Sequence, residues 1–416
     1  MEWETALPPN GQIRQNNKAL FSPVKVGGVE IPNRIAKSAM AEGCCTEDGL
    51  PMPRLYEMYR RWAKGGAGLL ITGMAHVRQG HGYTGREIGI YNDGCITGLK
   101  SLVDLVHFEG ASKIFLQISY APPQIKRSTA KNIGSFAPSA RLNKTTFLFD
   151  KALSEKQIYE IIIDVAEGVR RAKDAGFDGV QLHAAHGYLI SQFLSPHYNK
   201  RTDAWGGDVF KRARFLLEII REAKKRVGSE FPITLKINAV DGAKDGLALP
   251  ESLQMAKAFE RSGVAAIEVS GGIGEVGLGF YPMRGEIPWD LSKKFLMGEV
   301  PAPVRALLPL LKLVIKMESQ KVSFIPCFHY DYAKKFAERL DIPVLCVGGI
   351  RTLEEASGIL SGSKVAMISL ARPLVREPGL PKKWADGLST KASCTSCDRC
   401  FVKIGLKEEL RCNCKA

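Results

Sequence analysis

The sequence predicts an α/β protein of the (β/α)8-barrel class, with an insertion between strands six and seven and a cysteine-rich C-terminal extension. Eight short apolar runs alternate with longer amphipathic segments, and polar residues follow several of the runs. A doubly wound open sheet is the alternative, but eight runs with polar residues at many strand ends favour the closed barrel. The runs are Arg34–Met40, Gly68–Ala75, Lys113–Ser119, Gly179–Ala184, Ile233–Ala239, Ala265–Gly271, Pro343–Gly348 and Lys364–Ala371.

The segments between these runs are predicted to be helices. Ser154–Ala175 carries isoleucine and valine at helical spacing, and its first residues fit a capping box, Ser154 with Gln157. Thr352 and Glu355 repeat that pattern. The predicted divisions are an N-terminal arm (1–19), a barrel domain (20–390) that includes an insertion or lid (280–331), and a Cys-rich tail (391–416).

Composition and charge narrow the class of protein. Hydrophobic residues make up 45% and charged residues 24%, which is typical of a globular chain. Ala306–Ile315 is the longest apolar candidate for a membrane span, but it is short and contains Lys312. The first residues lack the basic and apolar regions of a secretory signal, so we expect a cytoplasmic protein without a membrane partner.

The formal net charge of +15 raises the question of an anionic partner. A basic surface attracts nucleic acid, anionic lipid or phosphorylated small molecules. The lysines are dispersed rather than gathered in one block, which favours a solvated basic surface. We therefore expect a small-molecule substrate and no nucleic-acid partner, and the sequence leaves open whether the chain forms a homo-oligomer.

The most informative motif is His183-Ala184-Ala185-His186-Gly187-Tyr188, which follows a run predicted to be a buried parallel strand. The carboxyl ends of such strands carry the chemistry of α/β barrels. Two imidazoles can bind a substrate oxygen while the phenol of Tyr188 delivers a proton. An isolated His-x-x-His pair would more often mark a core histidine, so the surrounding residues decide the interpretation.

Those surrounding residues continue the motif through Leu189–Pro196 and Asn199–Gly207. With His183–Tyr188, they resemble the long signature of the Old Yellow Enzyme family of FMN-dependent ene-reductases. The resemblance extends from about Leu20 to Pro381. Further segments that match in the same order are Asn33–Met40, Leu116–Ile118, Phe136–Ser139, Val347–Ile350, Ser369–Leu374 and Arg376–Pro378.

This resemblance implies an FMN across the barrel mouth. Backbone groups of Ser38, Ala39 and Met40 are expected to face the flavin after the first strand, with Met74 on the second. Gln117 offers an amide that both donates and accepts hydrogen bonds toward the pyrimidine edge.

The resemblance also assigns the charged and phosphate-binding groups. Lys236 would place positive charge near the edge of the flavin that becomes negative on reduction. Gly348, Gly349, Ala371 and Arg372 follow strands seven and eight, where barrels commonly bind phosphate.

The activity implied is reduction of an activated C=C bond, such as that of an α,β-unsaturated carbonyl compound, with hydride from NAD(P)H. His183 and His186 would hydrogen-bond the substrate oxygen. Tyr188 would donate a proton to the α carbon as hydride reaches the β carbon.

Four positions depart from the family pattern. Ala41 stands where relatives often carry Cys or Thr, and Lys236 where many carry Arg, which alone can make a bidentate fork. Tyr120 replaces a frequent His, and Met74 a small residue. These changes indicate an altered substrate preference and redox potential rather than loss of the flavin.

The tail predicts a metal site. Five of the ten cysteines lie within it, and Cys394, Cys397, Cys400 and Cys412 form a set of four soft ligands, with Cys414 spare. Their spacing resembles, imperfectly, the iron–sulfur segment of the larger dienoyl-CoA reductase relatives. We expect either a [4Fe–4S] cluster, with a redox partner at the tail, or zinc; free thiols or disulfides are the alternative.

Two other enzyme classes remain open at this stage. Some relatives dehydrogenate amines or ring substrates. A basic FMN barrel that modifies tRNA would resemble dihydrouridine synthases, but the loop cysteine that such enzymes use as an acid has no match here. The Gly272–Gly277 stretch fits a dinucleotide fingerprint, yet the residues after it predict a loop rather than the required helix.

Overall fold

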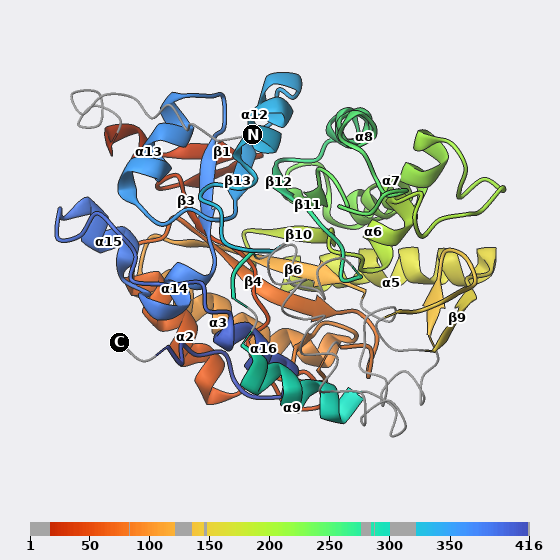
Figure 1. Cartoon of the computed structure of the whole chain (residues 1–416), viewed down its shortest axis with the longest axis horizontal. Helices are drawn as coiled ribbons and strands as arrows, with labels where there is room; N and C mark the ends of the chain where they lie inside the picture. The colour runs from red at the N-terminus through yellow and green to blue at the C-terminus, as the bar shows by residue number, and fades with distance from the viewer. Residues whose placement is uncertain are drawn as a thin grey trace.

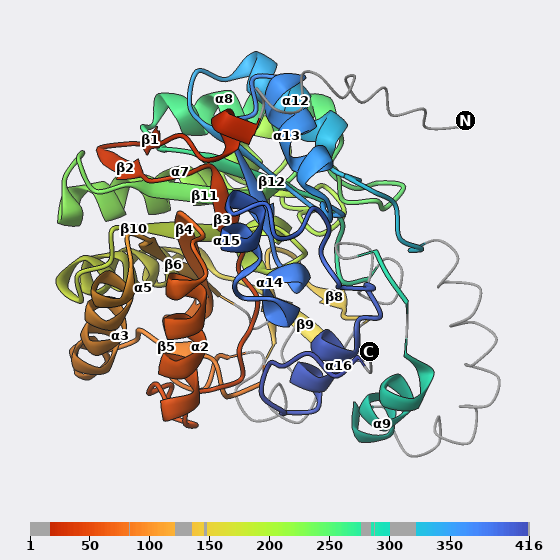
Figure 2. The same ribbon diagram turned by 90° about the vertical axis from the view of Figure 1, so that its left-hand side faces the viewer.

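The fold is known from a computed structural model that describes residues 17–82, 84–120, 135–144, 148–275, 284–286, 288–299 and 322–414. Figures 1 and 2 show strands gathered in the interior and helices arranged around them. Most of the predicted insertion (280–331) and residues 1–16 of the predicted arm lie outside the described residues. The domain limits therefore stay predictions.

Eight parallel strands form a closed barrel, as the sequence predicts. The hydrogen-bonded order is β3-β14-β13-β12-β11-β10-β6-β4, and a direct pairing of β3 with β4 closes the ring. Each strand overlaps one of the eight predicted apolar runs. The strands are β3 (Ile35–Lys37), β4 (Leu69–His76), β6 (Lys113–Ser119), β10 (Gly179–Ala184), β11 (Ile233–Asn238), β12 (Ile267–Ser270), β13 (Val344–Val347) and β14 (Met367–Leu370).

Helices of the outer ring follow the strands because each presents one apolar face to the barrel. The predicted capping boxes are present at both expected positions: Ser154 caps α5 with Gln157, and Thr352 caps α13 with Glu355. The helices of this ring are α2 (Pro53–Lys64), α3 (Ile96–Glu109), α5 (Glu155–Asp174), α7 (Val209–Val227), α8 (Leu249–Arg261), α12 (Tyr330–Arg339) and α13 (Leu353–Ser361).

Shorter elements lie at the two ends of the barrel. The hairpin β1 (Val24–Val26) and β2 (Val29–Ile31) packs Val26 and Ile31 against residues near the strand starts, which closes the amino-terminal end. A small sheet unites β7 (Phe136–Ala137), β8 (Arg141–Leu142) and β9 (Phe149–Ala152). The remaining elements are β5 (Ile88–Gly89), η1 (Asp93–Cys95), α6 (Leu189–Leu194), α9 (Trp289–Glu299), α14 (Arg372–Arg376), α15 (Leu380–Ala385) and α16 (Arg399–Gly405).

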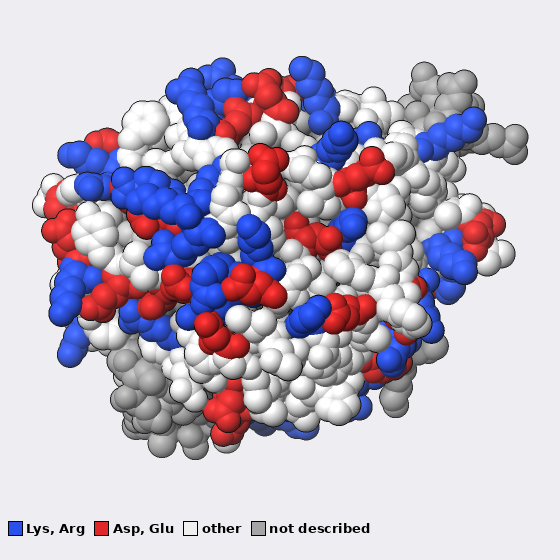
Figure 3. All heavy atoms as spheres, turned by 180° about the vertical axis from the view of Figure 1, so that it is seen from behind, with Lys and Arg blue, Asp and Glu red and all other residues white. Residues whose placement is uncertain are grey.

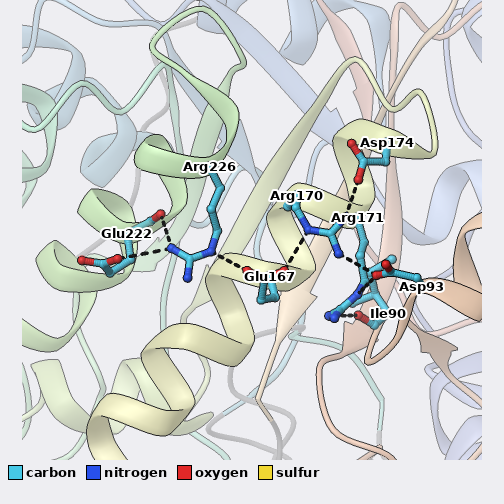
Figure 4. A network of polar contacts seen from close by, with 8 residues as sticks. All are labelled: Ile90, Asp93, Glu167, Arg170, Arg171, Asp174, Glu222 and Arg226. Atoms are coloured by element: carbon cyan, nitrogen blue, oxygen red, sulfur yellow. Dashed lines mark hydrogen bonds and ion pairs between the residues drawn. The ribbon is translucent and has the colours of Figure 1, made fainter.

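An ion-pair network ties neighbouring outer helices together (Figure 4). Glu167 on α5 binds both Arg170 of its own helix and Arg226 of α7, at 2.8 and 2.7 Å. Arg170 and Arg171 both reach Asp93 of η1. Because these side chains share partners, the network positions α5 and α7 more firmly than isolated surface pairs would.

The surface agrees with the prediction of dispersed charge where it can be seen. On the face in Figure 3, Lys and Arg side chains alternate with Asp and Glu rather than forming one basic field. In the part of the chain that the structure describes, no helix is both long enough and apolar enough to cross a membrane.

Candidate active site

Strand register places the main polar side chains in one row at the carboxyl end of the barrel. His183 of β10 lies opposite Lys236 of β11, and Lys236 lies opposite Glu268 of β12. All three side chains are buried. Since alternate residues of a parallel strand face the same side, this register brings the three groups into one layer.

The two histidines and the tyrosine form a compact cluster. The ring centre of His183 lies 5.1 Å from that of His186 and 4.7 Å from that of Tyr188. His183 is the penultimate residue of β10, whereas Tyr188 is the N-cap of α6. The turn between the strand and this short helix therefore brings the three rings of the predicted motif together.

His186 adopts a strained backbone conformation that its neighbours hold in place. Its φ is +64°, a region that residues with a side chain seldom occupy. Its backbone N–H donates to Asn238 Oδ1 at 3.2 Å, and its Nε2 lies 2.8 Å from Ser270 Oγ. These contacts from β11 and β12 fix the imidazole at the barrel mouth, and such strain is often found at functional sites.

Both histidines are neutral at ordinary pH. Burial lowers the pKa of His183 from 6.5 to about 3, and the charge of Lys236 contributes in the same direction. Burial, with the nearby imidazole of His183 and the charge of Lys236, also holds the pKa of His186 well below its usual value. His183 Nδ1 has no hydrogen-bond partner among the described residues. A buried polar atom without a partner is costly, so it is available to a ligand.

Lys236 is held in a buried polar network. Its Nζ donates to Ser38 Oγ at 2.9 Å and lies 3.2 Å from Glu268 Oε2. Ser38 Oγ in turn donates to Glu268 Oε1 at 2.7 Å. Burial favours the neutral form of Glu268, but Lys236, Ser38 and Gln181 outweigh it, so the pKa of this carboxyl stays below its usual value. Glu268 is therefore ionised, and the Lys236 side chain that it pairs with lies beside the histidine cluster.

Gln117 joins the same network from strand β6. Its Nε2 donates to Gln181 Oε1 at 2.8 Å, and Gln181 Nε2 donates to Glu268 Oε2 at 3.0 Å. Met74 lies opposite Gln117 in the register of β4, after a bulge that follows Ile71. Of the predicted flavin contacts, Ser38, Met74, Gln117 and Lys236 thus all lie on the barrel strands or directly after them; Ala39 and Met40 follow Ser38 in the chain.

The two predicted phosphate-site glycines need to be glycine. Gly348 and Gly349 have φ values of +114° and +77°. A Cβ on Gly348 would lie 2.7 Å from the Phe328 ring, and one on Gly349 would lie 2.5 Å from the carbonyl oxygen of Ile325. Only glycine permits this close packing after β13.

Arg372 points toward the tail. It is the first residue of α14, after Ala371. Its guanidinium forms an ion pair with buried Asp398 and donates to the carbonyl oxygen of Arg284 at 3.2 Å. Its role as a phosphate clamp stays a prediction, because this pairing engages the same group.

These residues fit an FMN. The site offers a buried ammonium group, a carboxamide, a His183 ring nitrogen without a partner among the described residues, and glycine backbone after β13. Those are the groups that an anionic edge, an amide edge and a phosphate of a flavin require.

Sequence reasoning missed three members of the site. Glu268 lies in an otherwise apolar run. A carboxylate in a strand that is predicted to be buried, next to the strand that carries Lys236, indicates a buried ion pair and could have identified Glu268. Gln181, inside another such run, gave the same kind of signal. His329 gave none, because it belongs to the segment interpreted as an insertion.

His329 is buried at the start of α12. Its Nδ1–H donates to the carbonyl oxygen of Val347 at 3.0 Å, which leaves the lone pair on Nε2. Burial lowers its pKa to about 3. A Cβ on Gly271 would lie 3.1 Å from His329 Nε2, so this imidazole stands between the ends of β12 and β13.

The tail brings its thiols together. Cys394, Cys397, Cys400, Cys412 and Cys414 line one small cavity beside α14 and α16. All ten cysteines of the chain are free thiols in this structure. Within the described residues, no three ligating side chains stand close enough together to hold a metal ion. The four-cysteine metal site therefore stays a prediction, although its members share a cavity.

The comparisons with known proteins agree with this geometry. Residues 19–272 match the family model described as the NADH:flavin oxidoreductase / NADH oxidase family. An NADH oxidase of Thermoanaerobacter brockii is 32% identical over 398 residues, which is 95% of this chain and 55% of that protein. An NADPH dehydrogenase of a Geobacillus species is also 32% identical, over 375 residues, which is 90% of this chain and 96% of that protein.

Solved structures support the fold. A 2-naphthoyl-CoA reductase, solved with 2-naphthoyl-CoA, superposes with a TM-score of 0.81 and 22% identity, over 95% of this chain and 56% of that one. The chain spans about half the length of several relatives that it matches, including this reductase and the Thermoanaerobacter oxidase.

Proposed function

Because this chain belongs to the NADH:flavin oxidoreductase / NADH oxidase family, we propose that it uses FMN and NAD(P)H to reduce an activated C=C bond. The observation that carries the proposal is the cluster of His183, His186 and Tyr188 beside the buried Lys236. It combines two neutral donors, a phenol and a fixed cation at the mouth of a barrel, where barrel enzymes place their chemistry. The substrate is an α,β-unsaturated carbonyl compound or a close analogue.

The histidines bind the substrate oxygen. A neutral imidazole can donate one hydrogen bond, and the low pKa of His183 keeps it neutral throughout the physiological range. Two such donors stabilise the negative charge that develops on the oxygen as the C=C bond is reduced. Ser270 and Asn238 hold His186 in place for this task, so no reorganisation is needed during the reaction.

Tyr188 supplies the proton. Its ring lies against that of His183, so a substrate oxygen bound by the histidines brings the α carbon near the phenol. A phenol O–H positioned in this way acts as a general acid toward carbon. The charge that develops on substrate is then neutralised by protonation at the α carbon.

Ser38, Met74, Gln117 and Lys236, with backbone at Ala39 and Met40, would hold the flavin ring, while Gly348, Gly349, Ala371 and Arg372 would hold its phosphate. When bound, FMN supplies hydride transfer between NAD(P)H and the substrate. Lys236 would place a positive charge near the edge of the flavin that becomes negative on reduction.

Substitution of Tyr188 by Phe tests the proposal. In rapid-mixing experiments on the FMN-loaded enzyme, Tyr188→Phe should leave reduction by NAD(P)H unchanged and slow the step with an unsaturated ketone by about 10²–10⁴-fold. Tyr56→Phe is the matched control, since Tyr56 donates to the carbonyl oxygen of Gly98 on the outer helices. An unchanged ketone step in Tyr188→Phe would contradict the assigned role. Reduction of the enzyme by an amine would instead favour the dehydrogenase class.

We also propose that the tail cysteines bind a metal, either as a [4Fe–4S] cluster or as zinc. Five thiols that line one cavity form a donor set suited to both. Metal analysis of anaerobically purified protein should find stoichiometric iron or zinc, and Cys397→Ser should lower its content. A protein that contains neither would contradict this proposal and leave the barrel's function unaffected.

A further inference from the structure

A second cavity lies between α2 and the tail, away from the barrel mouth. Its volume is about 220 Å³. It is lined by Arg54, Met58, Arg61, Trp62, Val375, Arg376, Pro378, Leu410, Arg411 and Cys412. Figure 1 shows α2 next to α14, with the C-terminal end of the described chain beside them. Three separate parts of the sequence therefore meet at this cavity.

The charge of the lining is one-sided. Four arginines border the cavity, and no Asp or Glu is among its lining residues. Arg54 and Arg61 stand seven residues apart on α2, two turns along the helix, so they share one face. Four like charges around one cavity repel one another unless an anion is present.

The hydrogen-bond pattern shows which of these four arginines are available to bind a ligand in the cavity. Within the described residues, the guanidinium groups of Arg54 and Arg61 form neither a hydrogen bond nor an ion pair, although both side chains line the cavity. Arg376 donates to Ser393 Oγ at 2.8 Å and to Cys412 Sγ at 3.5 Å, neither of which is a carboxylate. Arg411 lies 3.7 Å from Glu408, which is its one ion pair within the described residues.

Arg60 shows what an ordinary surface arginine of this helix does. It adjoins Arg61 in sequence but is not among the cavity-lining residues, and it binds Glu109 at 2.9 Å and Glu57 at 3.3 Å. The same helix thus carries Arg60, whose charge is neutralised by carboxylates, and Arg61, which lines the cavity and pairs with no carboxylate among the described residues.

From this arrangement we propose that the cavity is a binding site for a compact polyanion that carries phosphate or carboxylate groups. Guanidinium groups bind both through paired hydrogen bonds. The floor formed by Met58, Trp62 and Leu410 is apolar and accommodates a small carbon skeleton. A volume below the range typical of larger organic ligands, about 300–1,000 Å³, favours a compact molecule over a protein segment.

The site adjoins the cysteine cavity. Val375, Arg376 and Cys412 line both spaces, so they form the wall between them. A bound anion would therefore contact the residue that also donates to a tail thiol. The inference does not depend on the proposed reaction at the barrel mouth.

Calorimetric titration of the FMN-loaded protein at low salt tests the proposal, with pyrophosphate and citrate as separate probes. We expect one or both to bind, and Arg61→Gln to weaken the binding by about tenfold or more, since it removes a charge-assisted pair. Arg54→Gln should have an effect of the same order. Arg60→Gln is the matched control and should leave the affinity unchanged.

Two results would overturn the proposal. The first is that neither anion binds the wild-type protein in the millimolar range. The second is that Arg60→Gln weakens binding as much as Arg61→Gln, which would indicate a non-specific effect of net charge. The flavin content of each variant shows that it is folded, and the comparison of Arg60 with Arg61 holds whether or not FMN occupies the barrel mouth.

Discussion

Lys236 and Glu268 form a buried ion pair in the row of residues that also contains His183. A single lysine here has two separable effects. It neutralises a carboxylate that burial would otherwise destabilise, and it places positive charge in the site. The first effect concerns folding and the second concerns redox chemistry, so the two can be tested separately.

Substitution of Lys236 by Gln should lower the flavin midpoint potential of the loaded enzyme, because a nearby cation favours the reduced form. It should also lower the free energy of unfolding by about 3–5 kcal/mol, since Glu268 would remain buried without its partner. The double variant Lys236→Gln, Glu268→Gln should regain much of that stability while its potential stays low. An unchanged potential in Lys236→Gln would show that the lysine is only structural.

At this scale the sequence predicted part of the site. The motif of His183, His186 and Tyr188 was evident because its members lie within six residues, and the structure brings their rings together. Contacts between distant strands were not evident. The bond from Ser38 to Glu268 joins residues far apart in sequence, and Arg372 pairs with Asp398 in the tail. No local pattern encodes such pairings, since they depend on closure of the barrel.

At the scale of elements, two of the ion pairs that attach the tail to the rest of the fold differ in burial. Arg372 of α14 binds Asp398, the N-cap of α16; the Asp398 side chain is fully buried and that of Arg372 is largely buried. Arg399 of α16 binds Asp290 of α9 at 2.7 Å, and both are partly exposed. Burial raises the pKa of Asp398 to about 6 despite the attraction of Arg372. The two pairs make a matched comparison of a buried and an exposed attachment.

Asp398→Asn should loosen α16. Removing one member of a buried pair costs about 3 kcal/mol, which corresponds to about a hundredfold faster hydrogen exchange if the helix opens locally. The amides of Phe401 and Val402, which donate to the carbonyl oxygen of Asp398, are the reporters. Asp290→Asn should change exchange little, because exposed pairs contribute about 1 kcal/mol or less. Equal effects of the two substitutions would contradict this account of the attachment.

The strands and helices were the features of the structure that the sequence predicted best. Periodic apolar runs located all eight barrel strands, and β6 and β10 have the predicted bounds. Strand β12 is shorter than its predicted run, because Ala265, Ala266 and Gly271 belong to the apolar run but lie outside the strand. The small sheet of β7, β8 and β9 was not predicted, since its short strands carry no alternation to detect.

At the scale of the whole molecule, buried histidines make stability depend on pH. Burial lowers the pKa of His183 and of His329 from 6.5 to about 3, and that of His186 in the same direction. The unfolded chain therefore binds more protons than the folded protein between these values. The stability contributed by neutral burial is fully present above pH 6.5 and is lost as the pH falls toward 3.

Urea unfolding at several pH values measures this effect. We expect the free energy of unfolding to fall by roughly 2 kcal/mol per lowered histidine between pH 6.5 and 5. His329→Asn should reduce this slope. His197 is the control with the opposite sign: bonds to Glu275 and Asp245 raise its pKa, so its contribution is present at low pH and is lost as the pH rises. Identical slopes in wild type and His329→Asn would contradict the prediction.

The most direct test of the central claim is an anaerobic absorption spectrum of the purified protein, followed by addition of NAD(P)H and then of an α,β-unsaturated ketone. We predict flavin bands that bleach with the nicotinamide and return with the ketone, as the residues around Lys236 and His183 imply. A protein that remains without flavin after FMN is added, or whose bleached flavin does not recover with any unsaturated carbonyl compound, would contradict the account.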